Sequence, residues 1–347
     1  MKPVQIIIPV SAINSGTMSS SLRNRGLWAY LLGAVLTSAY CLVYWAPELL
    51  GDPRDVWQWY GAIYTFVVLV FGVKKLRDYR NQRYHWYRTL SLITVQLVLA
   101  FILPRLLEHS GHGEFYVSYF WPLKPEYLFP STFNALVSSQ DGLRVFMGFW
   151  SLAMLVIATP VLTYFYGKRW YCSWVCGCGA LAETAGDSFR HLGSATEKSW
   201  NLERWTIYPI LALITTITVL LWYFEAHPAP ELESIVQTTN RIYGFVIGGL
   251  FSGIIGVGFY PILGSRIWCR FGCPMAAILG VLQKYVSRFR IETQAGQCIS
   301  CGNCTTYCEM GIDVRAYAQE GRDIQRASCV GCGVCVSVCP RGVLRAT

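Results

Sequence analysis

The strongest constraint on the fold is a series of six apolar runs, each long enough to cross a membrane as a helix. A spanning helix needs about 20 mostly apolar residues, and its backbone polar groups must pair with one another inside the bilayer. The chain is 53% hydrophobic and 14% charged, whereas soluble domains carry about 25% charged residues. We therefore predict an all-α membrane protein with about six transmembrane helices, roughly at residues 27–46, 57–73, 89–107, 143–166, 205–224 and 242–263.

The loops between these runs alternate in charge along the chain. Lys and Arg dominate before the first run and after the second, fourth and sixth runs, whereas the other three loops are rich in Asp and Glu. Because basic loops mark the cytoplasmic side, the pattern predicts a multi-pass protein of the bacterial inner (cytoplasmic) membrane with cytoplasmic N- and C-termini. The net charge of +9 lies in these short loops, which indicates the lipid bilayer as a partner and argues against nucleic acid.

Eight cysteines in the last fifty residues follow the spacing C-x2-C-x2-C-x3-C twice. This spacing is typical of proteins with two [4Fe-4S] clusters, in which the fourth cysteine of each run binds the other cluster. The prediction is therefore two clusters held by crossed sets of ligands. The first set is Cys298, Cys301, Cys304 and Cys339, and the second is Cys329, Cys332, Cys335 and Cys308.

Structural zinc and disulfides are the competing interpretations of these eight cysteines. Zinc sites use four ligands per ion without a tandem repeat of this spacing, and disulfides do not suit a reducing compartment. Glu309 stands where a proline often follows the first run, and this change removes no ligand. We predict a cytoplasmic tail (1–26), a transmembrane domain (27–285) and a small C-terminal α+β ferredoxin-like domain with two clusters (286–347).

Two further cysteine pairs follow the fourth and sixth apolar runs, in segments that resemble each other. Residues 167–176 read G-K-R-W-Y-C-S-W-V-C, and residues 264–274 read G-S-R-I-W-C-R-F-G-C-P. Parallel repeats inside membrane proteins are typical of a pseudo-twofold core with the functional site between the halves. Because residues four apart share one face of a helix, we expect each pair to lie on one helix.

The cysteines of these C-x3-C pairs are candidates for a third metal centre. They are Cys172, Cys176, Cys269 and Cys273, with Cys178 as a candidate additional ligand that breaks the symmetry of the repeat. The alternatives are a redox-active thiol relay and simple packing, since free cysteine behaves as a small hydrophobic residue. Paired thiolates also suit Cu(I).

The order of these motifs resembles that of the membrane 4Fe-4S polyferredoxin family that includes NapH, NosR and CcoG. The resemblance covers roughly residues 143–347, from the first C-x3-C unit to the two ferredoxin runs. It implies a membrane subunit of the quinol dehydrogenase type, which exchanges electrons with quinone and with partner redox subunits. The chain departs from the family pattern at Gly177-Cys178, where the family has proline.

Quinol oxidation needs a proton acceptor beside the bilayer, and His suits this role because its ordinary pKa lies near neutral pH. Five residues at the ends of the third and fifth runs are candidates: Glu108, His109, His112, His227 and His85. The competing interpretation is that these side chains are solvated interfacial groups or membrane anchors.

The leading hypothesis for function is a membrane-bound iron–sulfur electron-transfer subunit, which is an oxidoreductase component. Such a subunit passes electrons between the quinone pool and cytoplasmic [4Fe-4S] clusters or a partner reductase. The alternative is a factor that assembles or reduces a copper or iron centre for a partner oxidoreductase. A redox sensor is a third interpretation.

Overall fold

The computed structural model describes residues 26–51, 53–294 and 296–347. The predicted tail at 1–26 lies outside these residues except for Gly26, which begins the first helix. In the described part, six helices are long and apolar enough to cross a membrane: Gly26–Trp45, Val56–Asp78, Arg83–His109, Gly142–Tyr166, Glu197–Ala226 and Pro230–Gly258. The predicted number of membrane helices is confirmed, and the protein is a mostly helical, multi-pass membrane protein.

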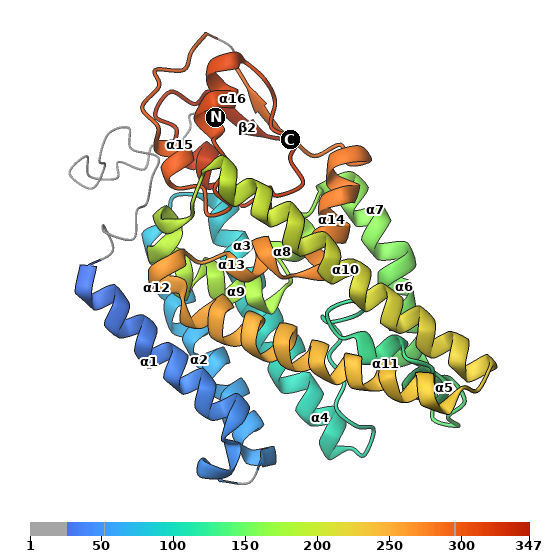
Figure 1. Ribbon diagram of the computed structural model, residues 1–347. Coiled ribbons are helices and arrows are strands. Elements are labelled where there is room, and N and C mark those ends of the chain that lie inside the picture. The colour runs from blue at the N-terminus through green and yellow to red at the C-terminus, as the bar shows by residue number, and fades with distance from the viewer. Residues whose placement is uncertain (1–25, 52, 295) are drawn as a thin grey trace.

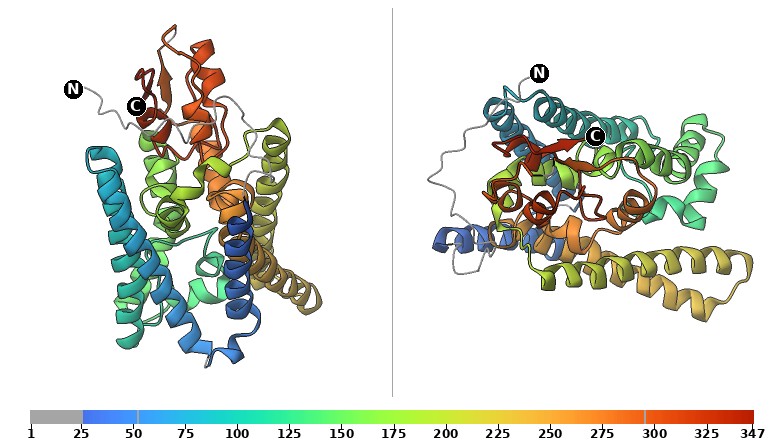
Figure 2. Two further views of the ribbon diagram at one scale, coloured as in Figure 1. Left: turned by 90° about the vertical axis from the view of Figure 1, so that its left-hand side faces the viewer. Right: turned by 90° about the horizontal axis from the view of Figure 1, so that it is seen from above.

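The first two spans are α1 (Gly26–Trp45) and α2 (Pro53–Asp78), with the 3-10 turn η3 (Pro47–Leu49) between them. They meet at the end of the molecule opposite the C-terminal unit (Figure 2). A Cβ atom added to Gly258 of the sixth span would lie 2.9 Å from Thr37 Oγ1 of α1. Small residues therefore allow α1 to approach the sixth span closely, as is common between membrane helices.

Three spans combine α-helical and π-helical segments. They are built from α3 (Arg83–Thr94), η4 (Val95–Ile102) and α4 (Leu103–His109); α6 (Gly142–Ala153), η6 (Met154–Ala158) and α7 (Thr159–Tyr166); and α11 (Pro230–Tyr243) and η8 (Gly244–Gly258). Pro104 and Pro160 each follow a π-helical segment. Proline lacks an N–H and clashes with the carbonyl four residues earlier, so a wider turn before it accommodates the ring. The helix continues past both prolines.

Two helices extend further than the apolar runs predicted. The helix α10 (Glu197–Ala226) begins at a cap in which the Thr196 side chain accepts a hydrogen bond from Ser199 N at 3.3 Å. In α11, Pro230 stands in the first turn together with two acidic residues. These are helix-start signals. The predicted starts at residues 205 and 242 were too late because hydropathy counts only the apolar turns.

Short helices link the spans to each other and to the C-terminal unit. They are η5 (Pro125–Leu128) and α5 (Pro130–Val137) before the fourth span; α8 (Arg169–Cys172), α9 (Gly177–Glu183) and the 3-10 helix η7 (Ala185–Leu192) after it; and α12 (Tyr260–Leu263), α13 (Ile267–Phe271) and α14 (Pro274–Tyr285) after the sixth span. In Figure 1, α8, α9 and α13 lie in the middle of the molecule, among the spans and beneath the C-terminal unit.

The C-terminal unit combines a strand pair with three short helices. The strands β1 (Ile291–Thr293) and β2 (Leu344–Ala346) pair antiparallel. Between them lie α15 (Asn303–Thr306), α16 (Val314–Glu320) and α17 (Val334–Ser337). The strand pair ties the two ends of the unit together, and the unit sits at one end of the molecule (Figure 1).

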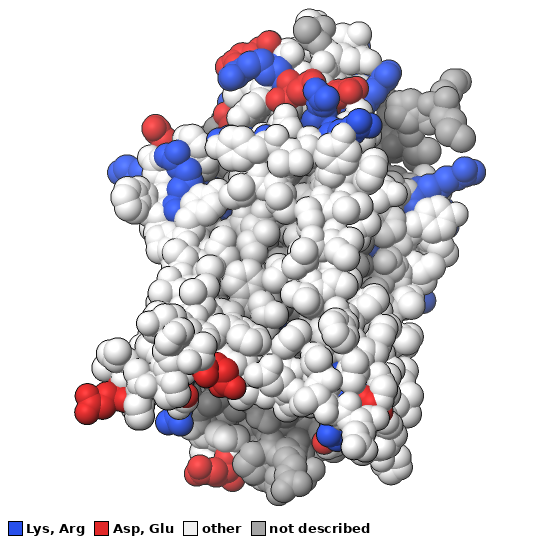
Figure 3. All heavy atoms as spheres, turned by 90° about the vertical axis from the view of Figure 1, so that its right-hand side faces the viewer, with Lys and Arg blue, Asp and Glu red and all other residues white. Residues whose placement is uncertain are grey.

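The surface has the character of a protein that is surrounded by lipid. On the face in Figure 3, charged side chains gather at the two ends, and the belt between them carries almost none. Large apolar side chains of the spans point outward: Phe66, Val156, Ile157 and Val219 are each at least 60% exposed. Soluble proteins rarely expose contiguous apolar surface of this extent, whereas lipid solvates it readily.

Candidate functional site

The eight C-terminal cysteines fall into two groups of four, and each group lines its own cavity. One cavity is lined by Cys308, Cys329, Cys332 and Cys335. The other is lined by Cys298, Cys301, Cys304 and Cys339. These are the two crossed sets expected from the spacing, and four thiols around one space suit a cubane. The ligand assignment itself stays a prediction.

Short helices and tight turns aim these thiols inward. Gly302 and Gly333 precede α15 and α17 in the left-handed region, with φ of 79° and 74°. Glycine adopts this region without steric cost. The backbone N–H of Ile312 donates to the sulfur of Cys308 at 3.4 Å. Hydrogen bonds of this kind to a cluster's sulfurs are one determinant of its reduction potential.

The cavity of Cys308, Cys329, Cys332 and Cys335 lies against the membrane part; we call it the proximal cavity, and the other the distal cavity. Five side chains of the membrane part donate to carbonyls of the loop before α17: Lys168 to Ala327, Gln283 to Cys329, Ser173 to Val330, Tyr84 to Gly331 and Arg88 to Cys332. At the distal cavity, Cys301 is exposed. The C-terminal unit, which we call the ferredoxin unit from here on, is therefore docked on the membrane part. Its proximal cavity faces the membrane part, and its distal cavity faces away from it.

The membrane cysteine pairs do not lie on single helices, which corrects the expectation from their spacing. Cys172 ends α8, and Cys176 is the residue before α9 with an extended backbone. In the same way Cys269 lies in α13, and Cys273 precedes α14. Each pair thus spans the junction of two short helices. The two units share this local structure, and all four cysteines are buried.

The two pairs come together in one buried cluster. The Arg266 guanidinium joins them, since its Nη1 lies 3.2 Å from the carbonyl oxygen of Cys172 and 3.6 Å from the sulfur of Cys269. A hydrogen bond from Cys178 lowers the pKa of the Cys176 thiol to about 7, against the opposing effect of burial. Burial raises the pKa of Cys172 to about 12. The Cys178 thiol therefore lies next to the first pair, and its role as an additional ligand stays a prediction.

A buried network of ion pairs lies beside these cysteines, with Glu183 at its centre. Its carboxylate pairs with Lys75 at 2.9 Å, Arg88 at 2.5 Å, Arg266 at 2.8 Å, and also with Arg190. All five side chains are at most 3% exposed. Burial alone would raise the pKa of Glu183, but the four bases lower it well below its usual range. Glu183 is therefore an anion in the folded protein.

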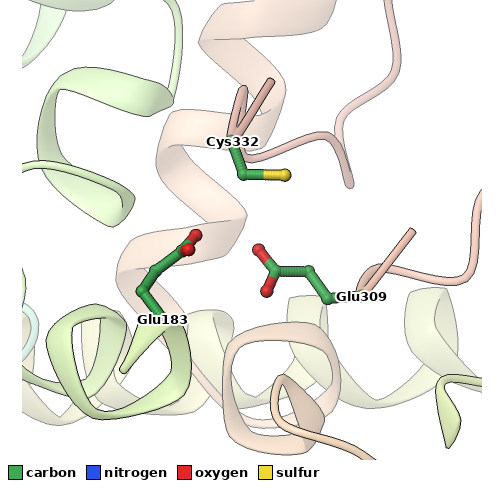
Figure 4. Close-up of side chains that lie close together, drawn as sticks. All are labelled: Glu183, Glu309 and Cys332. Atoms are coloured by element: carbon green, nitrogen blue, oxygen red, sulfur yellow. The ribbon is translucent and has the colours of Figure 1, made fainter. Parts of the chain in front are cut away.

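Glu309 extends this network into the ferredoxin unit. Its buried carboxylate pairs with Arg190 at 2.7 Å and with Arg266 at 3.1 Å. In Figure 4, Glu183, Glu309 and Cys332 converge, with their possible ligand atoms within 4.8 Å of one another. Because Arg and Lys side chains occupy both carboxylates, we interpret this junction as an ion-pair network and not as a cation site.

Sequence reasoning did not identify this junction. Glu309 was noted only for replacing a proline, and Glu183 was not singled out. The available signal was an acid within the basic segment that follows the first cysteine pair. Such an acid has no partner in its own helix, so the partners become visible only when distant segments meet.

The candidate proton acceptors at the ends of the spans opposite the C-terminal unit do not meet in one site. Glu108, His109 and His227 are exposed, at the ends of α4 and α10. His112 lies 3.3 Å from Asp141 in a partly exposed pair. A role for these residues in quinone chemistry stays a prediction.

His85 occupies a different environment from the other candidates. It is 1% exposed, and its Nε2 lies 2.5 Å from Ser337 Oγ in the ferredoxin unit. The neighbouring Tyr84 also contacts that unit through Gly331. The structure thus places His85 at the domain junction, where it helps to hold α17 against the third span.

Two family descriptions match the chain at its cysteine motifs. A 4Fe-4S dicluster domain matches residues 297–344, which include all eight C-terminal cysteines. A 4Fe-4S binding domain matches twice, at residues 147–194 and 245–292. Each of these two matches contains one of the C-x3-C pairs.

The chain is similar to several curated proteins. It is 30% identical over 177 residues to the putative electron transport protein YccM of Escherichia coli K12, which is 47% of each chain. It is 25% identical over 233 residues to the methylamine utilization ferredoxin-type protein MauN of Methylobacillus flagellatus, or 65% of this chain and 76% of MauN. It is 24% identical over 176 residues to the regulatory protein NosR of Stutzerimonas stutzeri, or 48% of this chain and 23% of NosR.

The chain therefore spans about half the length of YccM and less than a quarter of NosR. No solved structure matches it significantly. The fold and the cysteine sites define a multi-pass membrane protein with 4Fe-4S binding domains. Within that class, the chain fits the membrane 4Fe-4S polyferredoxin family, as the order of its motifs predicted.

The ligand assignment can be tested at the proximal cavity. Cys335→Ala removes one of its four thiols, so the iron content should fall by about four atoms per chain. Iron and acid-labile sulfide analysis, together with EPR of the reduced protein, measures this. The control Cys41→Ala changes a lone cysteine of α1 and should keep the iron content of the wild-type protein. Two intact cubane signals in Cys335→Ala would contradict the assignment.

The Glu183 network should dominate the stability of the junction. Glu183→Gln removes the anion that four buried bases share, and breaking a buried ion pair on one side costs about 3–5 kcal/mol. The apparent melting temperature in detergent should fall. The matched control Glu320→Gln breaks an exposed pair with Arg322 and should change stability by no more than about 0.5 kcal/mol. Equal melting temperatures for both variants would show that the network is not stabilising.

Proposed function

We propose that this protein is a membrane-bound iron–sulfur electron-transfer subunit. As an oxidoreductase component, it passes electrons between the quinone pool and a partner reductase through two [4Fe-4S] clusters. The observation that carries the proposal is the presence of three cysteine groups, one buried in the membrane part, one at the domain junction and one at the exposed side of the ferredoxin unit. The names of YccM and MauN, an electron transport protein and a ferredoxin-type protein, support it.

The proposed orientation follows from the loop charges. The ferredoxin unit lies at the end of the spans to which the basic loops belong, so it faces the cytoplasm of a bacterial cell together with both termini. Clusters persist in that reducing compartment. The exposed Cys301 and the neighbouring Ile299, which is 59% exposed, mark the face where a partner redox subunit would dock.

A short connection joins the membrane cysteines to the proximal cavity. The hydroxyl of Ser173, next to Cys172, donates to the carbonyl of Val330, next to Cys329, at 2.7 Å. The bound clusters would supply one-electron transfer. Oxidation of one quinol releases two electrons and two protons, so two clusters, one held by each group of four cysteines, would be enough to take up the two electrons, and the protons would pass to water.

A third metal centre at the membrane cysteines is part of the proposal. Its support is the matched placement of the two C-x3-C pairs at helix junctions and the two matches to a 4Fe-4S binding domain. This arrangement also supports a pseudo-twofold core built from the two units. The buried thiols suit Cu(I) as well, which keeps a role in the assembly of a partner's metal centre as the second candidate function.

Metal analysis combined with quinol reduction tests the proposed function. Iron, acid-labile sulfide and copper are measured per purified chain, and EPR spectra are recorded before and after addition of a menaquinol analogue. About eight irons with quinol-dependent cubane signals support the electron-transfer function, and about twelve add a third cluster. Stoichiometric copper with no response to quinol would instead support the assembly function.

The membrane cysteines should be required for the response to quinol. Cys269→Ser removes one thiol of the buried group and should abolish cluster reduction by quinol while dithionite still reduces both clusters. The two clusters of the ferredoxin unit should keep about eight iron atoms. An unchanged cluster content would show that the variant has lost electron transfer and has not misfolded. Cys41→Ser is the matched control. If quinol reduces the clusters of Cys269→Ser as it does those of the wild-type protein, the cysteine pair only contributes to packing.

A further inference from the structure

A cavity of about 760 Å³ opens within the membrane part between α1, α2 and the segment α9–η7. Its volume lies in the range of about 300–1,000 Å³ that is usual for small-molecule sites. Apolar side chains form most of its walls. Several of them are exposed on the outer surface of the spans, including Leu32 (43%), Trp59 (69%) and Ile63 (60%). A lipid-soluble molecule can therefore enter the cavity from the bilayer.

Four tyrosines bring hydroxyl groups into these apolar walls. They are Tyr40 of α1, Tyr60 and Tyr64 of α2, and Tyr260 of α12. The rings of Tyr40 and Tyr60 meet edge to face between the two helices, with centroids 6.0 Å apart. A tyrosine hydroxyl can donate to a carbonyl oxygen, and its ring can pack on a flat conjugated ring. The cavity thus combines mostly apolar walls with one region of aromatic rings and hydroxyl groups.

The inner wall of the cavity adjoins the first cysteine pair. Leu181, from α9, lines the cavity only a few residues after Cys176. The hydroxyl of Tyr64 donates to the carbonyl of Gly177 at 2.6 Å. A ligand in the cavity would therefore lie next to the cysteines that connect to the proximal cavity.

We propose that this cavity binds a prenylated quinone, with the head group beside Tyr40 and Tyr60 and the tail along the apolar walls. The inference rests on the proposed electron-transfer function and adds the place where the membrane-soluble electron carrier binds. A quinone combines a flat ring, two carbonyl acceptors and an apolar tail, and each matches one feature of the cavity. An acyl chain of a phospholipid matches the apolar walls but makes no use of the aromatic rings and hydroxyls of Tyr40 and Tyr60. The candidate proton acceptors predicted from the sequence are not among the residues that line this cavity.

The test uses the full chain in phosphatidylcholine nanodiscs, with clusters in place. An azido-ubiquinone probe reports binding by photolabelling and peptide mass spectrometry, and decylubiquinol reports electron transfer by the rate of cluster reduction. Ala39→Trp fills the cavity from α1. Ala34→Trp is the matched control, because Ala34 is an exposed residue of the same helix that does not line the cavity. Tyr60→Phe removes one proposed donor.

The expected result is labelling of peptides from α1 or α2 that Ala39→Trp abolishes and Ala34→Trp preserves, with parallel loss of reduction by quinol. Tyr60→Phe should weaken quinol binding about five-fold, the effect of losing one neutral hydrogen bond. Dithionite should reduce the clusters in every variant. Labelling that is the same in Ala39→Trp and Ala34→Trp, or a cavity that holds only phospholipid in native mass spectrometry, would overturn the assignment.

The two proposals fail in different ways. If quinol reduces the wild-type clusters and Ala39→Trp changes nothing, the electron-transfer function stands and the placement of the quinone is wrong. If the probe labels the cavity but quinol never reduces the clusters, the quinone site stands and the proposed electron-transfer function is wrong.

Discussion

The carboxylate of Glu183 is the group on which the arrangement of the whole junction depends. Its four basic partners come from α2, α3, η7 and the turn before α13. Removing such charges from water costs several kcal/mol per ion, and the cost is offset only when the partners are all in place. Two membrane spans and both cysteine units must therefore assemble together around one side chain.

Glu309 carries the same constraint into the ferredoxin unit. Because it shares Arg190 and Arg266 with Glu183, the position of the proximal cysteines is tied to that of the membrane cysteines. Backbone carbonyls of the loop before α17 add further contacts to the membrane part. The ferredoxin unit is thus held at a fixed place, and a fixed place suits electron transfer between neighbouring centres better than a flexible tether does.

Contacts between neighbouring segments connect the sites one after another. A tyrosine-containing cavity adjoins the first cysteine pair through Tyr64 and Gly177. Ser173 and Val330 connect the same pair to the proximal cavity, and the distal cavity reaches the outer face at Cys301. Each step joins segments that are far apart in the sequence. This order is what the proposed function needs, since each centre would exchange electrons only with its neighbours.

The sequence by itself determined the elements whose signals are local. Apolar runs of sufficient length indicate membrane helices because the bilayer leaves the backbone few alternatives, and the cysteine spacing indicates cubane sites because three ligands come from one short segment. Only the tertiary structure decided the rest. The C-x3-C pairs span helix junctions such as that before Cys273, which spacing alone could not distinguish from one continuous helix. Glu183 and Glu309 gain their importance from partners contributed by distant segments, and the cavity near Tyr60 exists only where α1, α2 and α9 meet, so no pattern within one segment could have predicted them.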